Sequence, residues 1–438
     1  MEQYEVRPSI RRACGALLSD PEIAKAVSFL ARDNELRLAE QIAIARIPAP
    51  SFHETQRAQD LAGRFRALSL EDVRIDGFGN VTGVRRGIGG GPRIAIDAHT
   101  DTVFDIDTPL EPRTEGTRVH MPGINDDASG LAAMLSVIRA LDAADIKTAG
   151  DLIFCGITAE EVGLKGMADF LGKNTFDACI SVDCDGIGYF VYGSMGRQQL
   201  EYTFLGQGGH VGRGDVSHAA YAAARAAVNI SKIPLRDGTT LTVSGIKTEA
   251  GSKPGQVCRT ASVQAELQAL SQADLDALRH AIEQAVSGAC SEENERQFLR
   301  PVLPPPPIMA PKRQSANSAL AADPRVTCQI NVLSSIPPAQ QDPHSPLLEG
   351  LYAIYQSMGI EEPLRIASAN SNAAEAIRKG IPGLTMGCGG SGGGVHTLDE
   401  YFDAADMDKG ASAVMLLALL MAGVPGTVAP QIETIGKA

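Results

Sequence analysis

The sequence has no apolar stretch long enough to cross a membrane as a helix. The apolar segment 413–422 is well short of the roughly 20 residues that such a helix needs. The first residues, Met-Glu-Gln-Tyr-Glu, also lack the basic region and apolar core of a secretory signal. We therefore expect a cytoplasmic protein without a membrane partner.

Basic residues and paired cysteine motifs are also scarce. The chain has 39 lysines and arginines against 52 aspartates and glutamates, which gives a net charge of −13. Because nucleic-acid binding needs a basic stripe, this balance argues against DNA or RNA as a partner. None of the 8 cysteines stands in a Cys-x-x-Cys motif, and several lie inside apolar segments, where buried reduced thiols are common. Such cysteines fit a reducing compartment.

The apolar residues that are present predict two kinds of domain. The chain has 438 residues, of which 44% are hydrophobic, and this length gives room for about two to three domains. Apolar strand-like segments alternate with helical ones up to about residue 192, which predicts an α/β domain with its sheet between helices. We place this domain in two parts, at 1–195 and 336–438.

A different pattern begins at residue 196. Strand-like and helical segments there follow the order strand, helix, strand, strand, helix: 198–205, 218–230, 239–246, 261–270 and 272–287. This order predicts an inserted α+β module of ferredoxin-like type. We place it at 196–335.

His99 and Asp101 stand directly after an apolar run that predicts a buried strand. The carboxyl end of such a strand is where an α/β sheet usually places its chemistry. An imidazole there can bind a divalent metal, and a carboxylate two residues later can hold its second ring nitrogen. An isolated pair of this kind is more often a structural hydrogen bond, so the interpretation depends on partners elsewhere in the chain.

Two further segments supply paired carboxylates. Asp126 and Asp127 precede a predicted helix, where one can cap the helix and the other can bridge cations. Glu160 and Glu161 directly follow a fully apolar predicted strand. Two acids at a buried strand end are costly unless a cation offsets their charge. They can divide the work of metal ligand and general base between them.

An acidic strand end and a histidine complete the set. The run 177–183 is another apolar segment that ends in acid, with both Asp183 and Asp185 available. His396 follows a glycine-rich segment, 387–394, that could bring it across to the other ligands.

Taken in order, these segments resemble the five ligand motifs of the M20 metallopeptidases, which are co-catalytic zinc exopeptidases and amidohydrolases. The motifs that carry the resemblance are His99-x-Asp101, Gly-x-x-Asp126-Asp127-x-x-Gly130, Glu160-Glu161, Asp183 near a glycine, and His396-Thr-x-x-Glu. The resemblance runs from about residue 48 to 423 and looks closest to the peptidase T-like branch. It implies a mixed-sheet, zinc-exopeptidase-like catalytic domain with an inserted α+β lid and dimerisation domain.

The resemblance also implies one or two divalent metal ions, zinc, manganese or cobalt. His99 and Asp183 would hold one ion, Glu161 and His396 would hold the other, and Asp126 would bridge them.

Two other acids receive roles from the same resemblance. Asp101 would orient His99, and Glu160 would be the general base. Asp185 is the alternative to Asp183 as a metal ligand.

In the inserted domain, His210 looks like the His-x-Gly motif of the family, in which the histidine reaches the active site of a partner subunit and helps to bind the oxyanion. This implies at least a homodimer. Gln268 stands where the family commonly has an arginine that grips a substrate carboxylate, so Arg259 or Arg213 could replace that arginine. Asn372, in a polar loop, is a further candidate for contact with the substrate.

We therefore predict a metal-dependent hydrolase that cleaves a C–N bond of a small-molecule substrate. A di- or tripeptidase is the first interpretation. An aminohydrolase or amidohydrolase on a non-peptide substrate, such as an aromatic amine or an N-acyl amino acid, is the second. A non-catalytic metal-binding relative is disfavoured, because Glu160 and all the ligand positions are intact.

Overall fold

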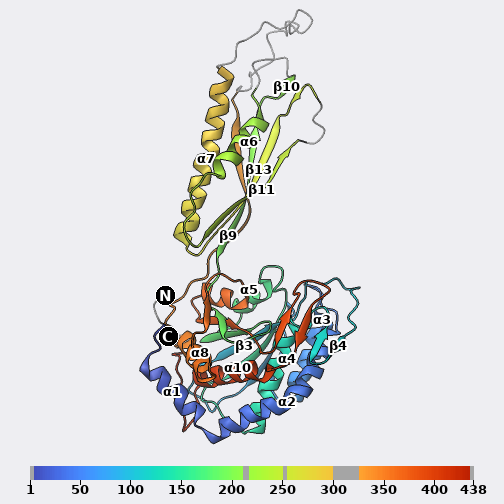
Figure 1. Cartoon of the computed structure of the whole chain (residues 1–438), viewed down its shortest axis with the longest axis vertical. Helices are drawn as coiled ribbons and strands as arrows, with labels where there is room; N and C mark the ends of the chain where they lie inside the picture. Colours follow the sequence, from blue (N-terminus) through green and yellow to red (C-terminus); the bar gives the residue numbers. More distant parts are fainter. Residues whose placement is uncertain (1–3, 211–216, 250–253, 299–324, 435–438) are drawn as a thin grey trace, which may run out of the picture. The chain divides into compact units, whose positions relative to one another are not determined.

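The computed structural model describes residues 4–210, 217–249, 254–298 and 325–434. Within these residues the chain forms two compact units, one comprising Met1–Ser194 with Ala339–Ala438 and the other Met195–Pro338 (Figure 1). None of the described helices has the length and apolarity of a membrane span.

An eight-stranded mixed sheet forms the centre of the first unit. From edge to edge its strands are β1 (Glu71–Ile75), β2 (Val81–Arg85), β6 (Leu152–Ile157), β3 (Ile94–His99), β7 (Ala178–Val182), β16 (Gly383–Met386), β8 (Tyr189–Val191) and β15 (Leu364–Ile366). β3 is parallel to both β6 and β7, while β2 runs antiparallel to β6. Every residue of β3, β6, β7 and β16 is buried, as expected for parallel strands that are covered on both faces.

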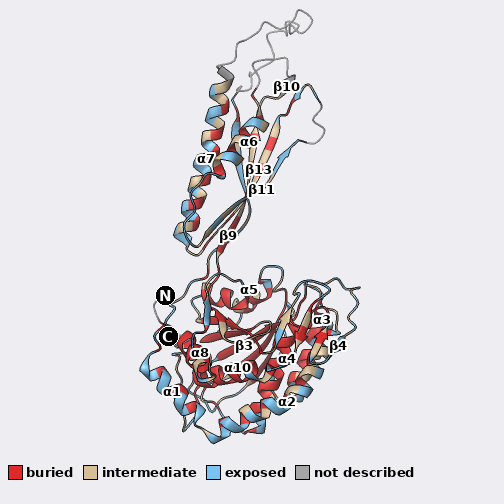
Figure 2. Cartoon of the chain, in the orientation of Figure 1, coloured by how far each residue is buried: buried red, intermediate tan, exposed pale blue. Residues whose placement is uncertain are grey.

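Helices cover both faces of this sheet. They are α1 (Pro8–Leu18), α2 (Pro21–Ala45), α3 (Thr55–Ala67), α4 (Ala128–Ala143), α5 (Lys165–Leu171), α8 (Pro346–Ser357), α9 (Asn372–Arg378) and α10 (Met407–Ala422). α10 packs against α2, α4 and α8, whereas α5 packs against α9. Figure 2 shows that α4 and α10 are buried along most of their length, which explains their nearly continuous apolar sequences.

A small antiparallel sheet positions the glycine-rich segment. Its strand order is β17 (Ser391–Gly393), β18 (Tyr401–Asp403), β5 (Arg118–His120) and β4 (Arg113–Glu115). His396 lies in the connection between β17 and β18, with a positive φ of 65°. The hairpin therefore presents this histidine from a structured base.

The second unit is an antiparallel sheet covered by two helices. The strand order is β11 (Thr239–Thr248), β13 (Thr260–Ala269), β9 (Gly196–Leu205) and β14 (Thr327–Ile336). Buried residues alternate with partly exposed ones along β9 and β13, because one face packs against α6 (Ala219–Ile230) and α7 (Gln272–Phe298). Two short strands, β10 (Gly209–His210) and β12 (Gln256–Val257), pair separately.

The predicted fold class is confirmed, since the first unit is mixed α/β and the second is an α+β unit with a small antiparallel sheet. The roles of lid and dimerisation domain stay predictions.

Candidate metal centre

Three neighbouring strands bring the candidate ligands to one edge of the sheet. His99 is the last residue of β3, Glu160 and Glu161 follow β6, and Asp183 follows β7. Because these strands are parallel, their carboxyl ends lie together. Asp126 lies in the loop before α4 and completes this side of the cluster.

The His99 imidazole contacts acidic residues through both of its nitrogens. Nδ1 lies 3.0 Å from the backbone oxygen of Asp101 and 3.5 Å from its Oδ1. A carbonyl oxygen only accepts a hydrogen bond, so Nδ1 carries the proton. Nε2 faces Asp126 Oδ1 at 2.7 Å. In the neutral tautomer, Nε2 is therefore the nitrogen with a lone pair to offer a metal.

The Asp126 carboxylate lies between two histidines. Its Oδ1 faces His99, and its Oδ2 is 3.1 Å from Nε2 of His396. His396 Nε2 is also 3.0 Å from Oε1 of Glu161. Each carboxylate oxygen thus points to a different histidine, which is the arrangement that a bridging ligand needs.

The structure separates the two aspartates after β7. Ligand atoms of Asp183 lie within 4.8 Å of those of His99 and Asp126 in groups that could hold a cation. Asp185 instead accepts hydrogen bonds from Asn125 Nδ2 at 2.6 Å and from the Gly392 backbone at 2.7 Å. The geometry favours Asp183 as the ligand and gives Asp185 a structural contact.

Asp127 is also close to the cluster, but its oxygens are engaged. Its Oδ2 accepts a hydrogen bond from the His99 backbone at 3.0 Å. Its Oδ1 accepts hydrogen bonds from the backbones of Gly130 and Cys184. Asp127 therefore caps α4 and ties it to β3 and to the segment after β7.

Burial disfavours the charged form of four acids at the cluster. Burial raises the pKa values of Asp127 and Glu160 well above their usual range, and it also raises those of Glu161 and Asp183. Burial disfavours charge on His99 as well. Its hydrogen bonds with acidic neighbours nevertheless hold the pKa of His99 well above its ordinary value. Carboxylate and imidazole donors of this kind fit a divalent cation such as zinc or manganese, which would offset the acids.

The Asp101 carboxylate holds the turn after β6. Its Oδ1 accepts a hydrogen bond from the Glu160 backbone at 2.9 Å, and its Oδ2 accepts one from the Glu161 backbone at 3.2 Å. Ser51 Oγ donates a further bond to Oδ2 at 2.7 Å. Asp101 thus positions both glutamates, in addition to receiving His99 through its carbonyl group.

A buried cation lies beside the cluster. The Arg57 guanidinium donates hydrogen bonds to backbone oxygens of Ile47 and Thr100. Burial lowers the pKa of Arg57 to about 10, against the opposing effect of nearby acids. Arg57 therefore stays protonated at neutral pH and offsets part of the acidic charge.

Sequence analysis assigned no role to Glu400, which the structure places under the Asp126 loop. Its side chain is fully buried and accepts hydrogen bonds from the backbones of Gly123, Asn125 and Asp126 at 2.8, 2.8 and 2.9 Å. Burial outweighs these bonds and raises its pKa to about 7. Glu400 ends the His396-Thr-x-x-Glu motif, so the signal was present, but spacing alone does not tell which loop it binds.

The remaining predicted residues are His210, Arg259, Arg213 and Asn372. His210 is in β10 of the second unit, and Arg259 is an exposed residue of the same unit. Arg213 lies outside the described residues. Asn372 begins α9, is 3% exposed and donates a hydrogen bond to Asp97 Oδ1 at 2.9 Å, so its side chain faces the interior. Their contacts with substrate or with a partner subunit stay predictions.

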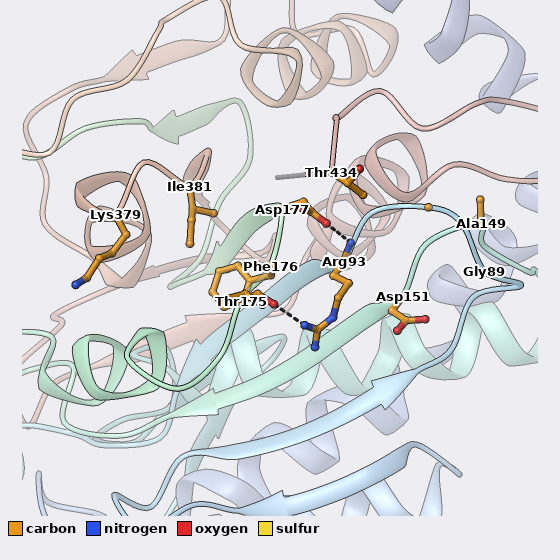
Figure 3. Close-up of a pocket in the computed structure, with 12 residues that line it drawn as sticks. Gly89, Arg93, Ala149, Asp151, Thr175, Phe176, Asp177, Lys379, Ile381 and Thr434 are labelled. Atoms are coloured by element: carbon orange, nitrogen blue, oxygen red, sulfur yellow. Dashed lines mark hydrogen bonds between the residues drawn. The ribbon is translucent and has the colours of Figure 1, made fainter. Parts of the chain in front are cut away.

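A cavity of about 500 Å³ lies at the opposite end of β3 (Figure 3). Arg93, which precedes β3, lines it together with Asp151, Asp177 and Lys379. No residue of the metal-ligand cluster lines this cavity. It is therefore a feature separate from the candidate metal centre.

Comparisons with known proteins agree with this geometry. The model of Peptidase family M20/M25/M40 matches residues 95–420, a range that contains all the cluster residues. The succinyl-diaminopimelate desuccinylase of Corynebacterium glutamicum is 29% identical over 214 residues, which are 44% of this chain and 57% of that protein. The chain therefore matches little more than half the length of this curated relative.

Solved structures share the fold over nearly the whole chain. The aminopeptidase PepT of Bacillus cereus has a TM-score of 0.71 at 20% identity, covering 88% of this chain and 97% of that one. A dinuclear metal binding peptidase of the M20 family from Bacillus subtilis has a TM-score of 0.64 at 13% identity, covering 90% and 99%. At these identities the likeness establishes the fold alone.

Proposed function

Because the chain belongs to peptidase family M20/M25/M40, we propose that it is a metal-dependent hydrolase that cleaves a C–N bond of a small substrate. The observation that carries this proposal is the Asp126 carboxylate, which directs one oxygen to His99 and the other to His396. A structural aspartate would need only one such partner.

The cluster divides into two ligand sets around Asp126. His99 and Asp183 would hold one divalent ion, and Glu161 and His396 would hold the second. Bound ions of this kind lower the pKa of a water molecule and polarise the carbonyl group of the substrate. Zinc, manganese and cobalt are the candidates, because the donors are imidazole nitrogens and carboxylate oxygens.

Glu160 is the proposed general base. Asp101 accepts a hydrogen bond from the Glu160 backbone, while the Glu160 carboxylate has no hydrogen-bond partner among the described residues. Burial raises the pKa of Glu160 well above its usual range, so its carboxylate binds a proton more readily than an exposed one does. Glu160 takes a proton from the attacking water and returns it to the nitrogen of the leaving amine.

Exposed apolar residues that neighbour cluster residues in the sequence support a substrate with an apolar group. Val103 follows Asp101 by two residues, and Val162 follows Glu161 directly; both are exposed. Leu398, two residues after His396, is 69% exposed. We propose that these side chains contact an apolar group of the substrate.

Phe52 is a further exposed apolar residue. Its side chain is 56% exposed, and its backbone donates a hydrogen bond to Glu54 Oε1 at 2.9 Å. The same oxygen accepts a bond from Ala159, directly before Glu160. Phe52 is thus tied to the turn that carries the proposed base. We propose a di- or tripeptide with an apolar residue beside the scissile bond.

A non-peptide substrate is the second candidate. Gln268, at the position expected for a carboxylate-gripping arginine, donates a hydrogen bond to Glu266 at 2.9 Å within the second unit. A neutral amide in that place does not attract a peptide carboxylate as an arginine would. An amide or amine substrate without this carboxylate fits that difference.

We further propose that the protein acts in the cytoplasm as a homodimer. The dimer would form through the inserted domain, and His210 would complete the site of the partner subunit. Arg259 or Arg213 would contact the substrate.

A substrate screen tests the proposed function. Tripeptides with and without apolar side chains, N-acyl amino acids and aromatic amines are each incubated with the full chain and zinc, manganese or cobalt. We expect hydrolysis of an apolar tripeptide that stops when a chelator removes the metal. Turnover of only the N-acyl or amine substrates would establish the second candidate. A lack of turnover with every substrate and metal would contradict the hydrolase assignment.

A further inference from the structure

Two cysteines of the second unit meet in space. Cys290 lies on α7 and Cys328 on β14, two elements that pack against each other. Both line a cavity of about 320 Å³, together with Tyr202 and Glu283. Both also pack against the apolar core of this unit, which holds the two positions in place.

Access distinguishes this pair from most other thiols of the chain. Five of the cysteines are buried: Cys14, Cys155, Cys179, Cys258 and Cys388. Cys184, Cys290 and Cys328 are partly exposed. Two of the three accessible thiols therefore lie together at one cavity, where a small oxidant can reach both.

The pair also has the chemistry for oxidation. The thiolate is the reactive form of cysteine. The neighbouring Cys328 lowers the pKa of Cys290 against the effect of burial, whereas the pKa of Cys328 is raised, so Cys290 is the thiol that ionises more readily. Cys328 then stands beside it as the second thiol.

We propose that Cys290 and Cys328 form a redox-sensitive dithiol, which a peroxide converts into a disulfide between α7 and β14. The Cys290 thiolate attacks one oxygen of hydrogen peroxide, the O–O bond breaks, and a sulfenic acid and water result. The Cys328 thiol loses its proton, its sulfur attacks the sulfenic sulfur, and the second water leaves as the S–S bond forms. Two thiols are thus oxidised and one peroxide is reduced to two waters.

The disulfide would join elements that are distant in sequence. β14 is an edge strand of the sheet of the second unit, and α7 covers that sheet. A bond between them closes a long loop, which restricts the unfolded chain and stabilises the unit. Thiol reductants would reverse the step. This inference does not depend on the proposed hydrolase activity.

Thiol counting and peptide mapping test the proposal on the full-length chain. The protein is treated with one equivalent of hydrogen peroxide, the remaining thiols are alkylated, and peptides are mapped without reduction. The untreated chain has 8 free thiols. We expect the treated chain to have two free thiols fewer and to contain one Cys290–Cys328 linkage, which dithiothreitol reverses. We also expect a higher melting temperature in the oxidised protein.

Three variants provide the controls. Cys290→Ser and Cys328→Ser should each lose the linkage, while Cys258→Ser, which removes a buried thiol of the same unit, should retain it. The wild-type mapping decides the matter even if a variant folds poorly. Unchanged thiols in the wild type, or a linkage through Cys184 or between chains, would overturn the proposal.

Discussion

At the scale of single residues, the sequence pointed to the cluster because His99, the two glutamates and Asp183 stand at the ends of apolar strands. Acids such as Glu160 and Glu161 directly after a buried strand are costly without a counter-charge, so their position carried information. The backbone contacts of Asp127 and Glu400 could not be predicted in this way. They connect loops that are distant in sequence, and such pairings depend on the complete fold.

The two adjacent glutamates give a prediction that separates their roles. Glu160→Gln should keep its metal and lose activity by roughly 10²–10⁴-fold, because an amide does not accept a proton at neutral pH. Glu161→Gln should lose metal affinity first, because its carboxylate contacts His396. Metal analysis and kinetics on both variants check this. Metal loss in Glu160→Gln with retention in Glu161→Gln would exchange the two roles.

At the scale of elements, the alternation of apolar strands and helices predicted the α/β class, which is confirmed. The order of the eight strands was not predictable, because parallel neighbours such as β3 and β6 come from distant parts of the chain. The hairpin that carries His396 was also missed. Its strands are only three residues each, and β17 is mostly glycine, so they leave little periodic signal.

Asp97 shows how a polar residue is accommodated inside a central strand. It lies in β3, fully buried, and accepts hydrogen bonds from Cys179 and Ser181 on β7 and from Asn372 on α9. Burial is the largest influence and raises the pKa of Asp97 to about 6 from the ordinary 3.8. The sequence of β3 gave no indication of these donors.

This raised pKa predicts a pH-dependent stability. The folded chain binds the Asp97 proton more tightly than the unfolded chain does. This difference adds to the free energy of unfolding below about pH 4, and the contribution is lost as the pH rises through 6. The free energy of unfolding changes by roughly 3 kcal/mol for a pKa shift of this size. Asp97→Asn should remove this contribution, because an amide does not titrate in this range.

Denaturant unfolding of the wild type and Asp97→Asn between pH 4 and 7 measures the effect. The variant should fold, since the Asn372 side-chain oxygen has no partner among the described residues and can accept a bond from the new amide after a flip. The difference between the two unfolding free energies should change with pH in the stated direction. A constant difference would contradict the assignment of this titration to Asp97.

At the scale of the whole molecule, the family and the predicted hydrolase class agree with the comparisons. The function of the second unit stays a prediction, because its proposed role depends on a partner subunit. Sequence reasoning reached His210 only through the family resemblance. The sequence around His210 does not indicate which active site this residue would serve.

A complementation experiment tests the role of His210 across subunits. Mixing inactive His210→Ala with inactive Glu160→Gln should restore activity, because a mixed dimer has one site with both residues intact. Random pairing would return up to about a quarter of wild-type activity. Mixing Glu160→Gln with Glu161→Gln is the matched control, since every site then keeps a defect. Activity that stays at the single-variant level, despite proven subunit exchange, would place His210 outside the partner's chemistry.

The central claim is that the cluster around Asp126 holds the metal that supports hydrolysis. Metal content per chain, measured after reconstitution with zinc or manganese and removal of free ions, tests it most directly. We predict one or two ions per wild-type chain and the same in Asp145→Ala, which changes an exposed acid away from the cluster. Asp126→Ala should lose metal, because the shared carboxylate between His99 and His396 is gone. Full metal content in a folded Asp126→Ala chain would contradict the account.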